Sequence, residues 1–160
     1  MGVRGWILIS LCFFLGGCSW ITRFVVQNAS ATEVKLSYWV PKHLNVGSGE
    51  SICPIGEGDV PLVMSGTLSD LQRADLWVET PNYHYDPERC SAEFVLRPGE
   101  AARVSEEALY TGHDRSLGSD AVGLERLTVR RYDGETTLSG WDLVKSFRKV
   151  SVSLYVLEYE

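Results

Sequence analysis

The sequence predicts a mainly β protein: a single antiparallel β-sandwich, Ig-like or transthyretin-like in general architecture, with one or two short helices. Roughly seven or eight short stretches are rich in β-branched and aromatic residues and alternate apolar with polar positions. Turn-forming residues separate these stretches, and few segments have helical apolar spacing. A partly open β-barrel is the alternative architecture. The chain of 160 residues is long enough to bury one hydrophobic core.

Two strands are expected at the beginning of the domain. Residues 23–27 (RFVVQ) are largely apolar and β-branched, and residues 33–40 (EVKLSYWV) place every second, apolar residue on one face. The polar segment 28–31 between them favours a turn, and Pro41 ends the second strand. This pattern predicts a β-hairpin.

The rest of the chain continues the strand pattern. Further strands are predicted at residues 60–63, 74–79, 93–96, 101–104, 124–132 and 150–159. The last of them nearly reaches the C-terminus and is expected in the core. Asp133-Gly134 is the strongest hairpin signal. Helical spacing is found at residues 141–147, Ser105 favours a short helix over residues 105–109, and residues 69–74 suggest one helical turn. Loops are expected at residues 45–59, 80–89 and 111–123.

The N-terminal residues have the composition of an export signal. Arg4 supplies a positive charge, residues 5–15 form an apolar run too short to span a bilayer, and the run closes on Leu15-Gly16-Gly17-Cys18. This tetrapeptide resembles the lipobox of bacterial lipoproteins. The resemblance implies that residues 1–17 are a cleaved signal peptide and that Cys18 is acylated and becomes the first residue of the mature protein.

The same resemblance predicts where the protein resides. Ser19 follows the cysteine, whereas lipoproteins retained in the inner membrane of Gram-negative bacteria commonly have Asp at that position. We therefore expect an exported protein anchored by acylated Cys18 to the periplasmic face of the outer membrane of a Gram-negative bacterium. Residues 18–22 would be a very short tether and residues 23–160 the β-sandwich domain. Trp20 and Ile21 would either enter the membrane interface or be buried in the domain.

Charge and cysteine content limit the possible partners. The chain has 15 basic and 21 acidic residues, so removal of Arg4 with the signal leaves a net charge of −7. An acidic protein lacks the basic surface needed to bind nucleic acid. Cys12 would be lost with the signal. Cys53 and Cys90 are predicted to form a disulfide in the oxidising envelope, the alternatives being two separate buried thiols or a metal role.

One segment of the sequence stands out as a candidate recognition loop. Residues Tyr83, His84, Tyr85 and Asp86 follow Trp77 closely, and aromatic side chains with polar ends suit contacts with proteins or glycans. His84 and Asp86 would also lie on one side of an extended segment, where an imidazole and a carboxylate can bind a metal or exchange protons.

The search for catalytic motifs gives no nucleophile elbow, P-loop, zinc-protease helix or EF-hand loop. We therefore expect a non-enzymatic, membrane-anchored envelope lipoprotein without a cofactor, which binds or scaffolds a protein partner in the envelope. A small-ligand or metal-binding periplasmic domain is the alternative, favoured if His43, His84 and His113 cluster in space. An envelope enzyme acting on glycan or peptidoglycan is a further alternative.

Overall fold

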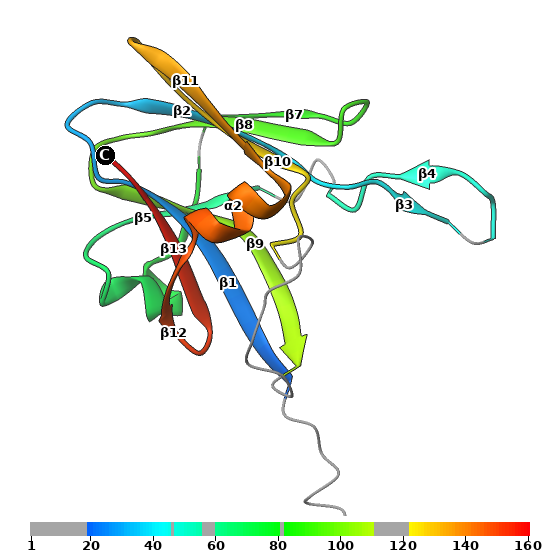
Figure 1. The fold of residues 1–160 in the computed structure, drawn as a ribbon, viewed down its shortest axis with the longest axis horizontal. Coiled ribbons are helices and arrows are strands. Elements are labelled where there is room, and N and C mark those ends of the chain that lie inside the picture. Colours follow the sequence, from blue (N-terminus) through cyan, green and yellow to red (C-terminus); the bar gives the residue numbers. More distant parts are fainter. Residues whose placement is uncertain (1–18, 46, 56–59, 81, 111–121) are drawn as a thin grey trace, which may run out of the picture.

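Two open β-sheets pack face to face in the computed structural model of the protein, which describes residues 19–45, 47–55, 60–80, 82–110 and 122–160. The sheets are not closed into a barrel (Figure 1). The predicted β-sandwich is therefore confirmed, and the partly open barrel is not formed. The signal segment with Cys18 lies outside the described residues.

The larger sheet, sheet A, contains both the first and the last described strands of the chain. Its order is β12 (Arg148–Ser151), β13 (Leu154–Tyr159), β1 (Ser19–Asn28), β9 (Glu100–Tyr110), β5 (Leu62–Ser65) and β6 (Val78–Glu79). β1 and β13 run parallel, so this pair departs from the predicted antiparallel arrangement, while the other neighbours in the sheet are antiparallel. The terminal strand thus pairs on both sides and is part of the core, as predicted.

The second sheet, sheet B, is antiparallel throughout. Its order is β11 (Gly134–Ser139), β10 (Arg126–Arg131), β2 (Val34–Trp39), β8 (Ser91–Leu96) and β7 (Tyr83–Asp86). A separate two-stranded arm, β3 (His43–Leu44) and β4 (Ser51–Ile52), extends away from the sandwich (Figure 1). One α-helix, α2 (Gly140–Ser146), connects sheet B to sheet A, and two 3-10 turns, η1 (Asp70–Gln72) and η2 (Ala74–Leu76), precede β6.

The main hydrophobic core lies between the sheets. Because side chains alternate along a strand, β2 turns Val34, Leu36 and Tyr38 inward and leaves the residues between them partly exposed. The large, fully buried side chains of this core are Phe24, Leu36, Leu96, Leu127 and Leu143. The helix α2 contributes Leu143 and Val144, as its predicted apolar spacing requires.

A second apolar cluster covers the opposite face of sheet A. Val25 in β1, Met64 in β5 and Ala101 in β9 point away from the main core, and Leu71 of η1 packs over them. Consequently β1 is buried on both faces, which explains why residues 23–27 show no alternation. At its two edges β1 pairs with β13 and with β9, so β1 is a central strand of sheet A.

The predicted hairpin of residues 23–27 and 33–40 is wrong, because β1 and β2 belong to different sheets. Asn28 makes the corner between the sheets. Its buried amide nitrogen Nδ2 donates to the carbonyl oxygens of Thr32 (2.8 Å) and Leu96 (3.0 Å), and its Oδ1 accepts from the backbone N–H of Ser30 (3.1 Å). These hydrogen bonds stabilise the connection from β1 to β2, which crosses between the sheets and does not form the tight turn of a hairpin.

Residues 19–22 of the expected tether and the expected helix at residues 105–109 both form β-structure. β1 begins at Ser19, and its residues 19–24 pair with residues 105–110 of β9. Thr22, predicted in the tether, is buried, whereas Ile21 is 63% exposed. A local capping signal at Ser105 is overridden because the long strand β1 offers a complete partner for β9.

Other boundaries differ from the predictions as well; β5, for example, covers residues 62–65 and not residues 60–63. Residues 150–159 form the hairpin β12–β13 with Val152 in the turn, where it is exposed. Residues 74–79 begin as η2 before the short β6. The hairpin at Asp133-Gly134 is confirmed, but Arg131 pairs with Gly134, so the two turn residues are Tyr132 and Asp133.

Candidate binding surface at the disulfide corner

A disulfide links the arm to sheet B. Cys53 follows β4 directly, and Cys90 ends the turn between β7 and β8; their Cα atoms are 5.4 Å apart. The predicted disulfide is therefore confirmed. Cys90 is fully buried, and its φ of 53° is the one positive φ of a non-glycine residue in the described part of the chain. Its carbonyl oxygen accepts a hydrogen bond from the backbone N–H of Val40 (3.0 Å), just before the arm.

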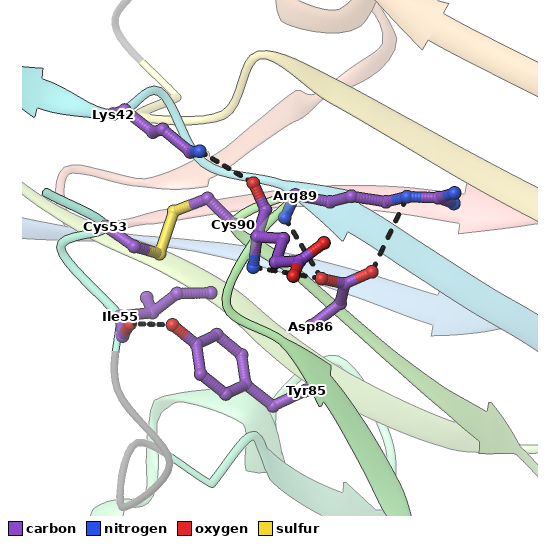
Figure 2. Close-up of a disulfide and its surroundings, with 8 residues drawn as sticks. Lys42, Cys53, Ile55, Tyr85, Asp86, Arg89 and Cys90 are labelled. Atoms are coloured by element: carbon purple, nitrogen blue, oxygen red, sulfur yellow. Dashed lines mark hydrogen bonds and ion pairs between the residues drawn. A yellow bond between two sulfur atoms is a disulfide. The ribbon is translucent and has the colours of Figure 1, made fainter. Parts of the chain in front are cut away.

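Asp86 shapes the turn that presents Cys90. Its Oδ1 accepts from the backbone N–H groups of Glu88 and Arg89, each at 3.0 Å, and its Oδ2 pairs with the Arg89 guanidinium at 3.5 Å (Figure 2). Lys42, at the base of the arm, donates from Nζ to the carbonyl oxygen of Glu88 (2.6 Å). The carboxylate of Asp86 thus serves the turn, and Lys42 fixes the arm to that turn.

The segment predicted as a recognition loop is an edge strand. β7 pairs with β8 on one side and ends the order of sheet B. Tyr83 and Tyr85 point toward the interior, while His84 is exposed on the outer face. The Tyr85 hydroxyl donates to the carbonyl oxygen of Ile55 (2.6 Å), beyond the disulfide (Figure 2). This segment is too short and too polar to be predicted as a strand from its sequence. It is extended because it pairs with β8.

An open hollow of about 500 Å³ adjoins β7. It is lined by Tyr83, His84, Tyr85 and Pro87. Tyr85 and His84 belong to opposite faces of the strand, so the hollow lies along the strand's outer edge. Three aromatic side chains and one proline ring therefore line an open space beside the edge strand β7.

Trp77 lies elsewhere in the fold. Its indole Nε1 donates to the carbonyl oxygen of Leu71 (3.3 Å), and the ring packs in the second apolar cluster on the outer face of sheet A. The structure thus brings four of the five predicted recognition residues together in β7 and separates the fifth from them. Trp77 packs on sheet A and Tyr83 belongs to sheet B, although the two residues are only six positions apart in the sequence.

The arm was missed by sequence analysis, which placed a loop there. All of its described residues, 41–45 and 47–52, are exposed, including Leu44 at 69% and Ile52 at 46%. Asn45 closes the end of the arm: its carbonyl oxygen accepts from Gly49 N–H (2.8 Å), where φ is 71°. Glycine tolerates that backbone conformation without strain. The sequence gives little indication of a hairpin here, because each strand of the arm has only two residues.

Histidine positions bear on the metal-binding alternative. His43 is exposed on the arm and His84 is exposed on β7, whereas His113 lies outside the described residues. Within the described ranges, no three His, Cys, Asp or Glu side chains are arranged to hold a metal ion.

The exposed face of sheet B beside β7 carries a charged pair. Glu93 of β8 lies opposite His84, accepts from the Ser37 hydroxyl (3.0 Å) and forms an ion pair with Lys35. Partial burial acts to raise the pKa of the Glu93 carboxyl, but the hydrogen bonds from Lys35 and Ser37 outweigh it, so that pKa is lowered. An ionised carboxylate therefore stands next to the exposed edge strand.

Compared with known proteins, the chain matches no protein-family model, and neither a curated protein nor a solved structure shows significant similarity to it. Among the described residues, no helix is both long and apolar enough to cross a membrane.

Proposed function

We propose that the protein is a lipid-anchored lipoprotein of the bacterial envelope, without catalytic activity, whose β-sandwich binds and scaffolds another envelope protein. The observation that carries this proposal is the arm, which is exposed along its described length yet fixed at its base. The disulfide corner, defined as the arm with the turn at residues 87–90, is the contact surface in this proposal.

Fixation of the arm favours binding. The disulfide, the Lys42–Glu88 hydrogen bond and the Tyr85–Ile55 hydrogen bond all join the arm's base to sheet B. An isolated two-stranded hairpin is marginal in water, so these links supply the order that the arm's few backbone bonds do not. A contact element that is already ordered loses less conformational entropy when a partner binds.

The exposed apolar side chains support a protein partner. Leu44 and Ile52 occupy positions on the arm where no part of the described sandwich covers them. Burial of such side chains against a partner contributes roughly 25 cal/mol per Å² of apolar surface. Glycan or lipid head groups would offer little apolar surface to these residues.

The anchor sets the position of this surface relative to the membrane. In the proposal Cys18 carries the lipid, and β1 begins at the next residue, Ser19. The domain would therefore stay close to the periplasmic surface of the outer membrane. Exposed Ile21, near the beginning of β1, would face the lipid head groups.

Site-specific photo-crosslinking in intact Gram-negative cells tests the proposal. A benzoyl-phenylalanine at Leu44 is expected to capture a defined envelope protein, identified by mass spectrometry. The matched control places it at Val152, which is 62% exposed in the β12–β13 turn, and is expected to capture no such protein. Cys18→Ser should abolish the capture and the incorporation of an alkyne-labelled fatty acid. Identical captures from both positions, or none from Leu44, would refute the contact.

The hollow beside β7 favours a second candidate function, binding of a small ligand. Two tyrosines, a histidine and a proline offer stacking surfaces and hydrogen-bonding groups. Titration with soluble peptidoglycan fragments, followed by NMR, tests it. Saturable shifts confined to residues 83–87, and absent in Tyr83→Ala, are the outcome that supports this function.

A further inference from the structure

Exposed sheet edges are the places where another chain can add a strand, and the two sheets have four edges. β12 exposes Arg148 and Lys149 and its register shifts after Lys149, while β6 has only two residues. β11 leads directly into α2, and Glu135 is its one charged residue, so two copies of β11 would not set opposite charges across from each other. Charges, irregular register and short length are recognised protections against strand addition.

β7 has fewer of these protections, although it is only four residues long and ends in Asp86. It has no lysine or arginine, and it pairs with β8 in continuous register over all four of its residues. The open hollow of about 500 Å³ lies along its edge. Since neighbouring strands are about 4.8 Å apart, another strand has room to approach there.

The sequence of β7 is complementary to itself. When two β7 strands pair antiparallel about a two-fold axis at Tyr85, His84 lies opposite the partner's Asp86, and Asp86 lies opposite the partner's His84. Tyr85 then lies opposite the partner's Tyr85 on the inner face. The Oδ1 of Asp86 serves its own turn, so the carboxylate would meet the partner's imidazole through Oδ2, beside Arg89. Imidazole–carboxylate and aromatic–aromatic pairs are favourable cross-strand neighbours.

Other symmetric registers are less favourable. An axis at His84 puts two imidazoles opposite each other, and an axis at Asp86 puts two carboxylates opposite each other, which is destabilising. An axis at Tyr83 puts His84 opposite the partner's Asn82 and loses both imidazole–carboxylate pairs. A shift by a single residue would bring inward-facing side chains of one copy next to outward-facing ones of the other. The register centred on Tyr85 is therefore selected by the side chains.

We infer that the partner at the β7 edge is a second copy of this chain, so that the two copies of sheet B join into one continuous sheet. A four-residue strand makes a small interface, so the association is weak in solution. Confinement to a membrane surface, which rests on the proposed lipid anchor, would raise the effective concentration of the copies. The arm is not used in this contact and remains accessible to another protein.

The test uses the full chain in cells that express two copies with different tags after Glu160. Benzoyl-phenylalanine at position 84 of one copy is expected to crosslink to residues 85–87 of the differently tagged copy. The same probe at Thr136, exposed on the β11 edge of sheet B, is the matched control and should give no such product.

A second variant tests the charge pairing. His84→Glu in the copy without the probe places a carboxylate opposite Asp86 and should lower the yield of the crosslinked dimer roughly three- to tenfold. His84 is exposed, so the variant should fold, which circular dichroism checks. Because Glu93 of β8 lies opposite position 84 in the same chain, His84→Glu is also measured together with Glu93→Gln, and the lowered yield should persist.

The outcomes separate this inference from the proposed function. If position 84 captures no second copy, or the crosslinks map outside residues 85–87, the inference is refuted, while capture of another protein from Leu44 can still stand. If His84→Glu leaves the yield unchanged, the proposed register is wrong. Leu44 capture should be unaffected by His84→Glu.

Discussion

The interior of the sandwich and the disulfide corner are ordered by different kinds of interaction. Between the sheets, large apolar side chains are fully buried, and Phe24 contacts the rings of Phe147 and Tyr155 at centroid distances of 5.5 and 5.3 Å. At the corner, the described arm residues are all exposed, and order comes from one disulfide and a few hydrogen bonds.

The interior therefore stabilises the fold, whereas the disulfide corner remains available for binding. Apolar burial is the dominant favourable term in folding, and it uses up the surface that a partner would need. A covalent link restricts the chain while it leaves the side chains accessible. The corner can therefore be both ordered and exposed, and the following substitutions test this division.

The largest effect is expected in the interior. Phe24→Ala removes a fully buried ring and leaves a cavity, so the free energy of unfolding should fall by about 3–5 kcal/mol. Urea unfolding followed by fluorescence measures it. Tyr132→Ala is the control, because Tyr132 is 87% exposed and should change stability by less than about 0.5 kcal/mol. A loss below about 1.5 kcal/mol for Phe24→Ala would mean that the core is not packed as described.

Removal of the disulfide should have a smaller and more local effect. The double substitution Cys53→Ser and Cys90→Ser opens a link across 37 residues of sequence, and the chain-entropy account gives a loss of about 3–4 kcal/mol. Far-UV circular dichroism should be preserved, and hydrogen exchange should accelerate in residues 41–55 before it does in β1 or β13. Uniform acceleration throughout the chain would show that the corner and the interior are one cooperative unit.

The sequence alone was sufficient for the fold class, the helix α2, the disulfide and the inward face of β2. Periodicity assigns a strand's faces because alternation follows directly from backbone geometry. It does not assign partners, and for this reason β1 and β2 were expected to form a hairpin although they lie in different sheets. Pairing depends on contacts between distant segments, such as β1 with β13.

The candidate site was predicted only in part. Tyr83, His84, Tyr85 and Asp86 do gather, but the segment lies between Pro81 and Pro87, a composition typical of a loop, and β8 makes it a strand. Trp77 is drawn to the second apolar cluster because a large ring gains more by burial there than by exposure near β7. The arm depends on the disulfide for its order. The pairing of the two cysteines could be predicted, but no local sequence pattern shows that this distant link orders an arm.

The smallest effect concerns the exposed face of sheet B and depends on pH. The pKa of Glu93 is lowered in the folded protein, so its contribution to stability is present above the ordinary carboxyl pKa of about 4.3 and is lost as the pH falls through the lowered value. The side chains of Lys35 and Glu93 are 42% and 35% exposed, so solvent screening limits the loss in Glu93→Gln to about 0.5 kcal/mol at pH 7.

Urea midpoints at pH 7 and pH 3 measure this effect. The difference between the wild type and Glu93→Gln should be present at pH 7 and smaller at pH 3, because protonation of the carboxyl removes its ion pair with Lys35. Ser37→Ala removes one of the two hydrogen bonds to Glu93 and should reproduce part of the loss with the same pH dependence. A difference that is equal at both pH values would assign the effect to packing, and the exposed face of sheet B would then resemble the interior more closely than the corner.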